Sequence, residues 1–143
     1  MAGVVGRDTG LAQLFVLEDV SSASLEGFVG RVTRPDVTLY GDEWGGYAWV
    51  AASGRGHATV CHTAVPREWA RDDDGDGVRE VHNNTCEGLW TGLRNFLRPF
   101  RGVSKWYLDE YVGIFQWLHT LKAVAGDFLR ALVGLPLTTD LGP

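Results

Sequence analysis

Alternating and clustered hydrophobic positions at the start of the chain predict a β-hairpin followed by a helix. The segments Val4–Gly6 and 11–17 are apolar and partly β-branched, and residues 7–10 between them have turn chemistry. Ser21-Ser22 then offers a helix N-cap. One apolar helix face follows at the spacing i, i+3, i+4, i+7, made by Leu25, Phe28, Val29 and Val32.

The middle of the chain has the pattern of two short strands separated by a short helix. Residues 34–36 break the first helix, and Val37–Tyr40 reads as a strand with Asp42 directly beyond its end. Residues 47–52 predict a short helix and Ala58–Cys61 a further strand. A polar, acidic loop then runs from about 66 to 80.

The strongest helical pattern is in His82–Arg98, where apolar residues recur at 86, 89, 90, 93, 96 and 97. Asn84 is the expected N-cap, and Glu87 three residues later completes a capping-box arrangement. We expect this helix to end near Pro99 and Gly102.

The C-terminal part predicts more helix and then a tail. Ser104 can cap a helix whose apolar positions continue from Leu108, and residues 123–133 look helical as well. The order β-β-α-β-α-β-loop-α-α predicts a mixed α/β fold. Since no repeat or linker divides the chain, we expect one domain at 1–133 and a flexible tail at 134–143.

Composition narrows the class of protein. A length of 143 residues with 45% hydrophobic and 22% charged residues fits one globular domain. No apolar run is long enough for a membrane span, no signal-peptide pattern is present, and Cys61 and Cys86 predict reduced thiols in a cytoplasm. The net charge of −5 hides an asymmetry, because acid gathers at 72–76 and base at Arg94, Arg98, Arg101 and Lys105.

Asp42 and Glu87 are the leading candidates for chemistry. One follows a strand and the other lies in the first turn of a later helix, and such positions meet at one edge of an α/β layer. Converging carboxylates suit a pair of Mg²⁺ ions. A turn role for Asp42 and a capping role for Glu87 are the structural alternatives.

Three further patterns have a functional and a structural interpretation each. Asp72, Asp74, Asp76 and Glu80 match part of a calcium loop, although Asn83 stands where that loop needs Glu, and a solvated loop is the alternative. The basic residues could contact nucleic-acid phosphates or form a solvated face. Zinc ligands could come from five residues that otherwise suit core or solvent roles, namely His57, Cys61, His62, His82 and Cys86.

Two motifs in the right order carry a family resemblance over about residues 4–133. The segment Tyr40–Tyr47 resembles the Asp-Glu-Trp-x-Gly-Tyr motif of ISXO-type insertion-sequence transposases. The segment His82–Trp90 resembles their His-x-Asn-Thr-x-Glu-Gly-Phe-Trp motif. His57 and His62 fall where that group has histidines, and Arg94 stands where it often has lysine.

The resemblance implies a DDE-superfamily catalytic domain with an RNase H-like mixed sheet and C-terminal helices. It implies metal-dependent DNA cleavage and strand transfer, with Asp42 and Glu87 as catalytic ligands of Mg²⁺ or Mn²⁺. It places Arg94, Arg98, Arg101 and Lys105 near DNA. It also implies that His82 and Asn84 shape the site by supporting the metal ligands without binding the metal themselves. The implied partners are transposon-end and target DNA in a prokaryotic cytoplasm, close to the nucleoid, and a homo-oligomer is compatible with it.

One departure from the family matters for activity. The resemblance places a first catalytic Asp on a strand upstream of the hairpin, and neither Asp8 nor Asp19 is a good substitute. We therefore expect an N-terminally truncated domain that lacks the first strand of its sheet, exposes strand edges and is inactive alone. The alternative is a non-enzymatic nucleic-acid-binding or protein-binding module derived from a transposase.

Overall fold

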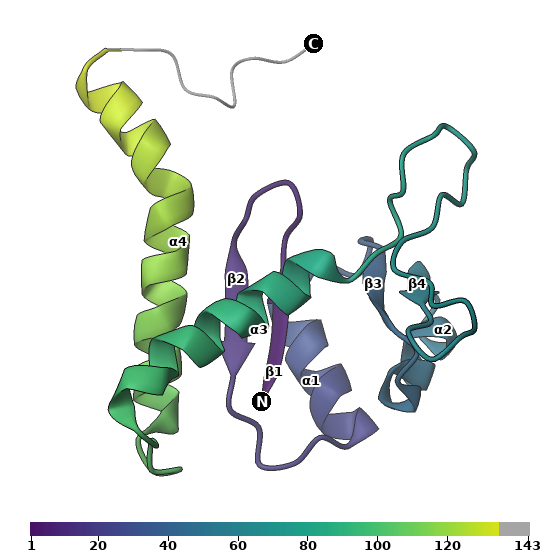
Figure 1. Cartoon of the computed structure of the whole chain (residues 1–143), viewed down its shortest axis with the longest axis horizontal. Helices are drawn as coiled ribbons and strands as arrows, with labels where there is room; N and C mark the ends of the chain where they lie inside the picture. Colours follow the sequence, from purple (N-terminus) through teal and green to yellow (C-terminus); the bar gives the residue numbers. More distant parts are fainter. Residues whose placement is uncertain (135–143) are drawn as a thin grey trace.

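The computed structural model describes residues 1–134, and the elements follow the order expected from the sequence (Figure 1). Some side chains between 122 and 132 lie outside that description, as does most of the expected tail, 135–143. The strands are β1 (Ala2–Val5), β2 (Ala12–Phe15), β3 (Leu39–Asp42) and β4 (His57–Val60). The helices are α1 (Ser22–Val32), α2 (Ala48–Ala52), α3 (Asn84–Leu97) and α4 (Leu108–Leu132), with 3-10 turns η1 (Gly45–Tyr47) and η2 (Arg98–Phe100).

The β1–β2 hairpin is covered by helices on both faces. Strand residues alternate between faces, so Ala2 and Phe15, which pair in the ladder, both pack toward α1. The neighbouring pair, Gly3 and Leu14, faces the other way, where Leu14 joins the core formed with α3 and α4. Phe28 of α1 is 1% exposed, and burying one such side chain contributes roughly 1.5–3 kcal/mol. The core therefore lies on both sides of a two-stranded ribbon, with α3 across it (Figure 1).

The second pair of strands forms a separate parallel sheet. Leu39 pairs with His57 and Asp42 with Val60, so the carboxyl ends of β3 and β4 lie side by side. The expectation of a mixed α/β fold is confirmed, whereas the single mixed sheet is not formed within residues 1–134, which have two two-stranded sheets. A groove of about 1240 Å³ is lined by β1, α1, β3 and the start of α3. No ladder links β1 to β3 across that groove in the described chain.

Of the three predicted N-caps, one forms at its helix. Ser104 does not cap α4, which begins at Leu108, and its hydroxyl accepts from the Trp106 backbone N–H at 3.4 Å. The Ser21 hydroxyl accepts a hydrogen bond from the Ser24 backbone N–H at 3.3 Å, which confirms the cap of α1. The cap predicted for α3 is wrong, because Asn84 is already the first helical residue and Asn83 precedes it. The Asn83 side chain makes no capping hydrogen bond, so no capping box forms. The Glu87 carboxylate therefore has no capping role at the start of α3.

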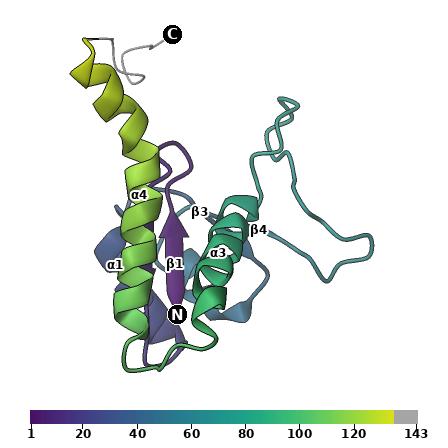
Figure 2. The same ribbon diagram turned by 60° about the vertical axis from the view of Figure 1, so that its left-hand side comes forward.

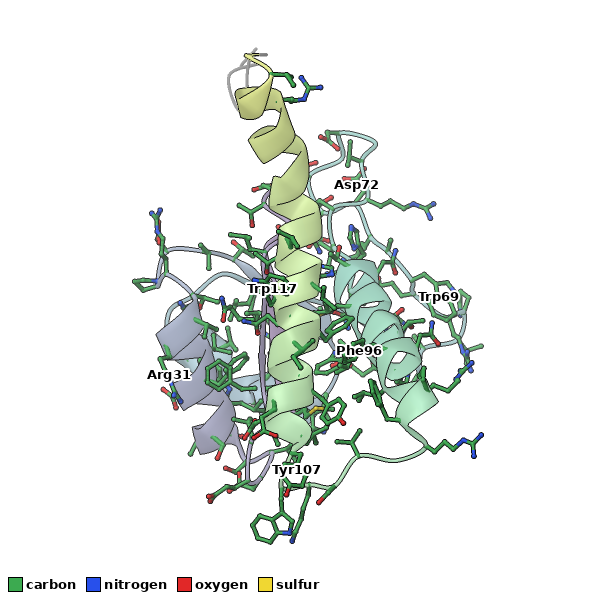
Figure 3. The ribbon with its side chains drawn as sticks, turned by 90° about the vertical axis from the view of Figure 1, so that its left-hand side faces the viewer. Arg31, Trp69, Asp72, Phe96, Tyr107 and Trp117 are labelled. Carbon is green, nitrogen blue, oxygen red and sulfur yellow. The ribbon has the colours of Figure 1, made fainter. Side chains whose placement is uncertain are left out.

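The C-terminal helical pattern, including the positions near 123–132, forms one continuous helix, α4, as the order of elements predicted. Its inner side packs on β2, where Val112 is buried and the Gln116 side chain accepts a hydrogen bond from the Leu14 backbone N–H at 2.6 Å. Figure 3 looks toward α4, with Trp117 labelled near its middle. Exposed apolar residues recur along the helix at Ile114, Trp117, Leu118 and Leu121. Although α4 is long, no helix in the described part of the chain is apolar enough to cross a membrane.

The loop between β4 and α3 extends away from the helices, as Figures 1 and 2 show from two sides. Its base is closed by a two-way backbone pairing of Arg71 with Val81, each N–H···O contact measuring 2.9 Å. This closure delivers the chain back to the start of α3 beside the strand ends. The pairing therefore helps to set the position of Glu87, in the first turn of α3, relative to Asp42 at the end of β3.

Candidate active site

Asp42 is the last residue of β3 and is half-buried at the edge of the parallel pair. Its carboxylate Oδ1 accepts a hydrogen bond from the Trp44 backbone N–H at 3.2 Å. Through this contact Asp42 stabilises the turn after β3, which is the structural role that the sequence offered as an alternative to metal binding. The second oxygen and the remaining lone pairs are still suited to a cation, because a carboxylate offers several acceptor positions.

Glu87 lies in the first turn of α3, with a side chain that is 49% exposed. Its Oε1 lies 3.5 Å from Nε2 of His62, a residue that follows β4. The partly buried thiol of Cys86 lies near both carboxylates. Its pKa is raised by burial and, to a smaller extent, by the negative charges of Asp42 and Glu87. The charges of both predicted carboxylates therefore act on one neighbouring side chain.

Glu43 is a site residue for which the sequence reasoning assigned no role. Its carboxylate accepts hydrogen bonds from the backbone N–H groups of His62 at 2.9 Å and Thr63 at 3.0 Å. These bonds favour the ionised form, the His62 bond first, and they lower the pKa of Glu43 to about 2. The signal was available, since Glu43 and His62 each follow a strand end that parallel pairing brings to one edge.

A small hollow of about 380 Å³ is lined by Asp42, Glu43, Trp44, Gly45 and His62. His62 is held there by the bond to Glu43 and by the edge of the Trp69 ring, with ring centroids 5.1 Å apart. Its Nε2 is buried and has no hydrogen-bond partner in the part of the chain that the structure describes. This imidazole nitrogen and the Glu87 oxygen 3.5 Å from it are atom types that a divalent transition-metal cation accepts as ligands.

His82 and Asn84, the two residues predicted to support the metal ligands, lie in different surroundings. The His82 carbonyl oxygen accepts a hydrogen bond from the Arg7 guanidinium, which also stacks 3.7 Å over the Tyr40 ring. Burial, and then the charge of Arg7, lowers the pKa of His82. Asn84 is exposed on the first turn of α3. Their supporting role stays a prediction, and Arg7 is the residue that links His82 to β3.

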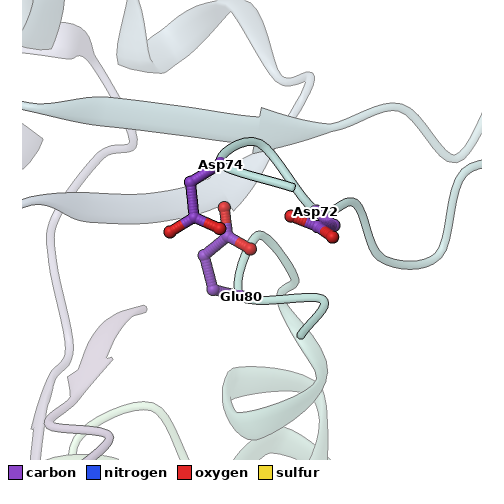
Figure 4. A group of neighbouring side chains, drawn as sticks. All are labelled: Asp72, Asp74 and Glu80. Carbon is purple, nitrogen blue, oxygen red and sulfur yellow. The ribbon is translucent and has the colours of Figure 1, made fainter. Parts of the chain in front are cut away.

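The alternative metal patterns are only partly assembled. In residues 1–134, the one group of three or more potential ligands with atoms mutually within 4.8 Å is Asp72, Asp74 and Glu80 (Figure 4). The calcium-loop spacing thus brings three carboxylates together, without Asp76. The histidines and cysteines considered for zinc form no such group within that range. Asp42, His62 and Glu87 are likewise not mutually within that distance in this conformation.

The basic residues predicted to contact DNA are all exposed, but they do not form one continuous helical stripe. Arg94 lies on α3 and its Nη2 donates to the Thr91 hydroxyl at 3.2 Å. Arg98 begins η2, and Arg101 adopts a left-handed conformation with φ 53° before Gly102. Lys105 lies beyond this turn with its ammonium 4.8 Å from the Trp106 ring. The break expected at Pro99 and Gly102 is confirmed.

Comparison with known proteins identifies the class as a transposase domain. The family model described as the ISXO2-like transposase domain matches residues 1–119. The chain therefore belongs to the ISXO2-like transposase domain family, a DDE family of insertion sequences, as its two motifs predicted. It is also similar to an uncharacterized protein in transposable element ISH50 from Halobacterium salinarum, with 44% identity over 54 residues. That match spans 37% of this chain and 18% of the relative, and no solved structure matches the chain.

Proposed function

We propose that this chain is a DDE transposase catalytic domain, or part of one, for metal-dependent DNA cleavage and strand transfer. The observation that carries the proposal is the grouping of Asp42, Glu43 and His62 around one hollow beside Glu87. Asp42 and Glu87 act as metal ligands, and Glu43 holds the segment that carries His62. When bound, two divalent ions supply activation of the attacking hydroxyl and charge stabilisation at the phosphate.

An RNase H-like arrangement is part of this proposal. It is supported by the element order and by the parallel β3–β4 pair, whose carboxyl ends carry Asp42 and precede His62. The groove between β1 and β3 offers a place where a further strand could join the two sheets. Transposon-end and target DNA would bind on the side of the molecule that carries three exposed arginines. These lie at the C-terminal end of α3 and just beyond it, and they are Arg94, Arg98 and Arg101.

A complete DDE site needs a third carboxylate, which the family resemblance places on another strand. Asp19 is engaged elsewhere, since its Oδ1 accepts from the Ser21 N–H at 2.8 Å and the Ser24 hydroxyl at 2.7 Å. Asp8 is exposed in the hairpin turn. We therefore expect no joined product from this chain alone in a strand-transfer assay with Mg²⁺ or Mn²⁺ and transposon-end DNA. Robust joining would contradict that expectation.

Divalent-cation binding tests the carboxylate pair directly. We expect Asp42→Asn and Glu87→Gln each to weaken Mn²⁺ binding, measured by calorimetry, by about tenfold or more, as for loss of a ligand or its support. Asp8→Asn is the matched control and should bind as the chain that carries Asp74→Asn alone does. All variants carry Asp74→Asn, which separates this site from the Asp72–Asp74–Glu80 group. Unchanged binding in both ligand variants would remove the proposed site.

The second candidate is a non-enzymatic DNA-binding module. It is favoured by the position of the exposed arginines, which lie at the opposite end of α3 from Glu87 and do not depend on it. Salt-dependent DNA binding that is unaffected by Asp42→Asn, together with no metal binding by the native chain, would favour this function over the catalytic one.

A further inference from the structure

His62 has an unexplained atom in the site. Its imidazole is 22% exposed, yet Nε2 itself is buried and lacks any hydrogen-bond partner among the described residues. The nearby Glu87 Oε1, at 3.5 Å, is too far for a good hydrogen bond. Buried polar nitrogens are almost always satisfied, so this atom calls for a proton or a cation between it and the carboxylate.

The spacing of the two atoms fits two ligands of one metal. Nitrogen and oxygen ligands that are each about 2.1 Å from a shared ion, at about 90–110° to one another, lie about 3.0–3.4 Å apart. The observed 3.5 Å separation of His62 Nε2 and Glu87 Oε1 is close to the upper end of that range. The half-exposed Glu87 carboxylate leaves the pair reachable from solvent.

The surroundings are negative and hold the ring in place. Asp42 and Glu43 line the hollow with His62, and Glu87 Oε1 lies 3.5 Å from the imidazole Nε2, so acidic residues gather here from β3, from the residue after it and from α3. Trp69 packs edge-on against the ring, and the Glu43 carboxylate fixes the His62 backbone. A ligand whose orientation is set in advance binds a cation with less ordering cost.

The geometry points to His62 as a nitrogen ligand that, with Glu87, makes this site prefer Mn²⁺ or another divalent transition metal over Mg²⁺. Mg²⁺ takes oxygen ligands and keeps its waters, whereas imidazole is a common ligand of transition metals. The inference deepens the proposed function and rests on it only in taking Glu87 as a ligand. It assigns His62 a role that neither the family match nor the two carboxylates supply.

Pulsed electron paramagnetic resonance on the Mn²⁺-loaded chain tests this assignment, in the Asp74→Asn background. We expect modulation from a directly coordinated ¹⁴N, which changes when the histidines are labelled with ¹⁵N and is absent in His62→Ala. His119→Gln, a histidine on α4, is the matched control and should keep the signal. If His62→Ala fails to fold, His62→Gln is the second variant and should also lose the coupling, because histidine labelling alone does not tell His62 from His57 or His82.

Affinities provide the second readout. We expect His62→Ala to weaken Mn²⁺ binding by about tenfold or more while weak Mg²⁺ binding stays close to that of the native chain. Absence of nitrogen coupling, or an equal loss of both metals in a folded His62→Ala, would overturn the inference. If Asp42→Asn and Glu87→Gln weaken binding but no nitrogen couples, only the His62 role fails. If both of those variants bind Mn²⁺ normally, the proposed function fails instead.

Discussion

The Glu43 carboxylate accepts a hydrogen bond from the His62 backbone N–H at 2.9 Å, and this contact joins the end of β3 to the segment after β4. Glu43 also accepts from Thr63, so one carboxylate satisfies two successive backbone donors. The arrangement resembles the way an acidic side chain satisfies free N–H groups at a helix start. It places the His62 ring beside Asp42 without using the Asp42 carboxylate.

Glu43→Gln should make the chain less stable at neutral pH and should reduce its sensitivity to acid. The folded-state pKa of Glu43 is lowered to about 2 by its hydrogen bonds, so its ionised form stabilises the fold above the unfolded value near 4.5 and this contribution is lost as pH falls toward 2. The difference between native and variant unfolding midpoints in urea should therefore shrink between pH 5 and pH 2. Glu26→Gln makes the same chemical change at an exposed residue of α1 and is the matched control.

Leu93→Ala should strongly destabilise the chain. Leu93 is 1% exposed and packs with Ala12, Leu14 and Val112, so truncation leaves a cavity between the hairpin, α3 and α4. The expected loss in the free energy of unfolding is about 2–5 kcal/mol, measured by urea denaturation. Leu118→Ala makes the same chemical change at a residue that is 42% exposed. It should stay within about 0.5 kcal/mol of the native chain, and an equal loss in both variants would contradict the packing described.

Ser21→Ala should weaken the start of α1. The Ser21 hydroxyl accepts from the Ser24 backbone N–H, and loss of such a cap costs about 1 kcal/mol. Ser21→Asp keeps an acceptor at that position and should recover most of the loss. Thermal denaturation followed by circular dichroism would measure both, and an Ala variant as stable as the Asp variant would mean that the cap contributes nothing.

Arg98→Ala and Arg101→Ala should lower DNA affinity and its salt dependence. If each arginine contacts one phosphate, the slope of log affinity against log salt should fall by about 0.9 per substitution on duplex DNA. Fluorescence anisotropy between low and moderate salt measures this. Arg31→Ala removes an exposed charge from α1, where its guanidinium lies 5.3 Å from the Phe15 ring, and should leave the slope unchanged. A slope that falls equally for Arg31 would point to general charge rather than to a DNA face.

Much of the local structure could be predicted because it depends on neighbours in sequence. The hairpin, the Ser21-capped helix and the amphipathic α3 each follow from short-range apolar spacing and turn residues. The N-cap of α3 could not be fixed in this way. Asn83 and Asn84 are chemically identical, and the backbone pairing of Arg71 with Val81, which brings the chain to the start of the helix, leaves no trace in the helix's own periodicity.

The sequence by itself determined the family, because its two motifs are local patterns with a fixed order and spacing. It also singled out Asp42 and Glu87 as candidate metal ligands, which stays a prediction. Only the tertiary structure decided that Glu43 anchors the His62 segment, that His62 Nε2 faces Glu87, and that the described strands form two sheets rather than one. Each of these depends on which strand edges and which strand ends meet. Pairing between segments far apart in the chain is decided by packing of the whole fold, and periodicity within one segment does not record it.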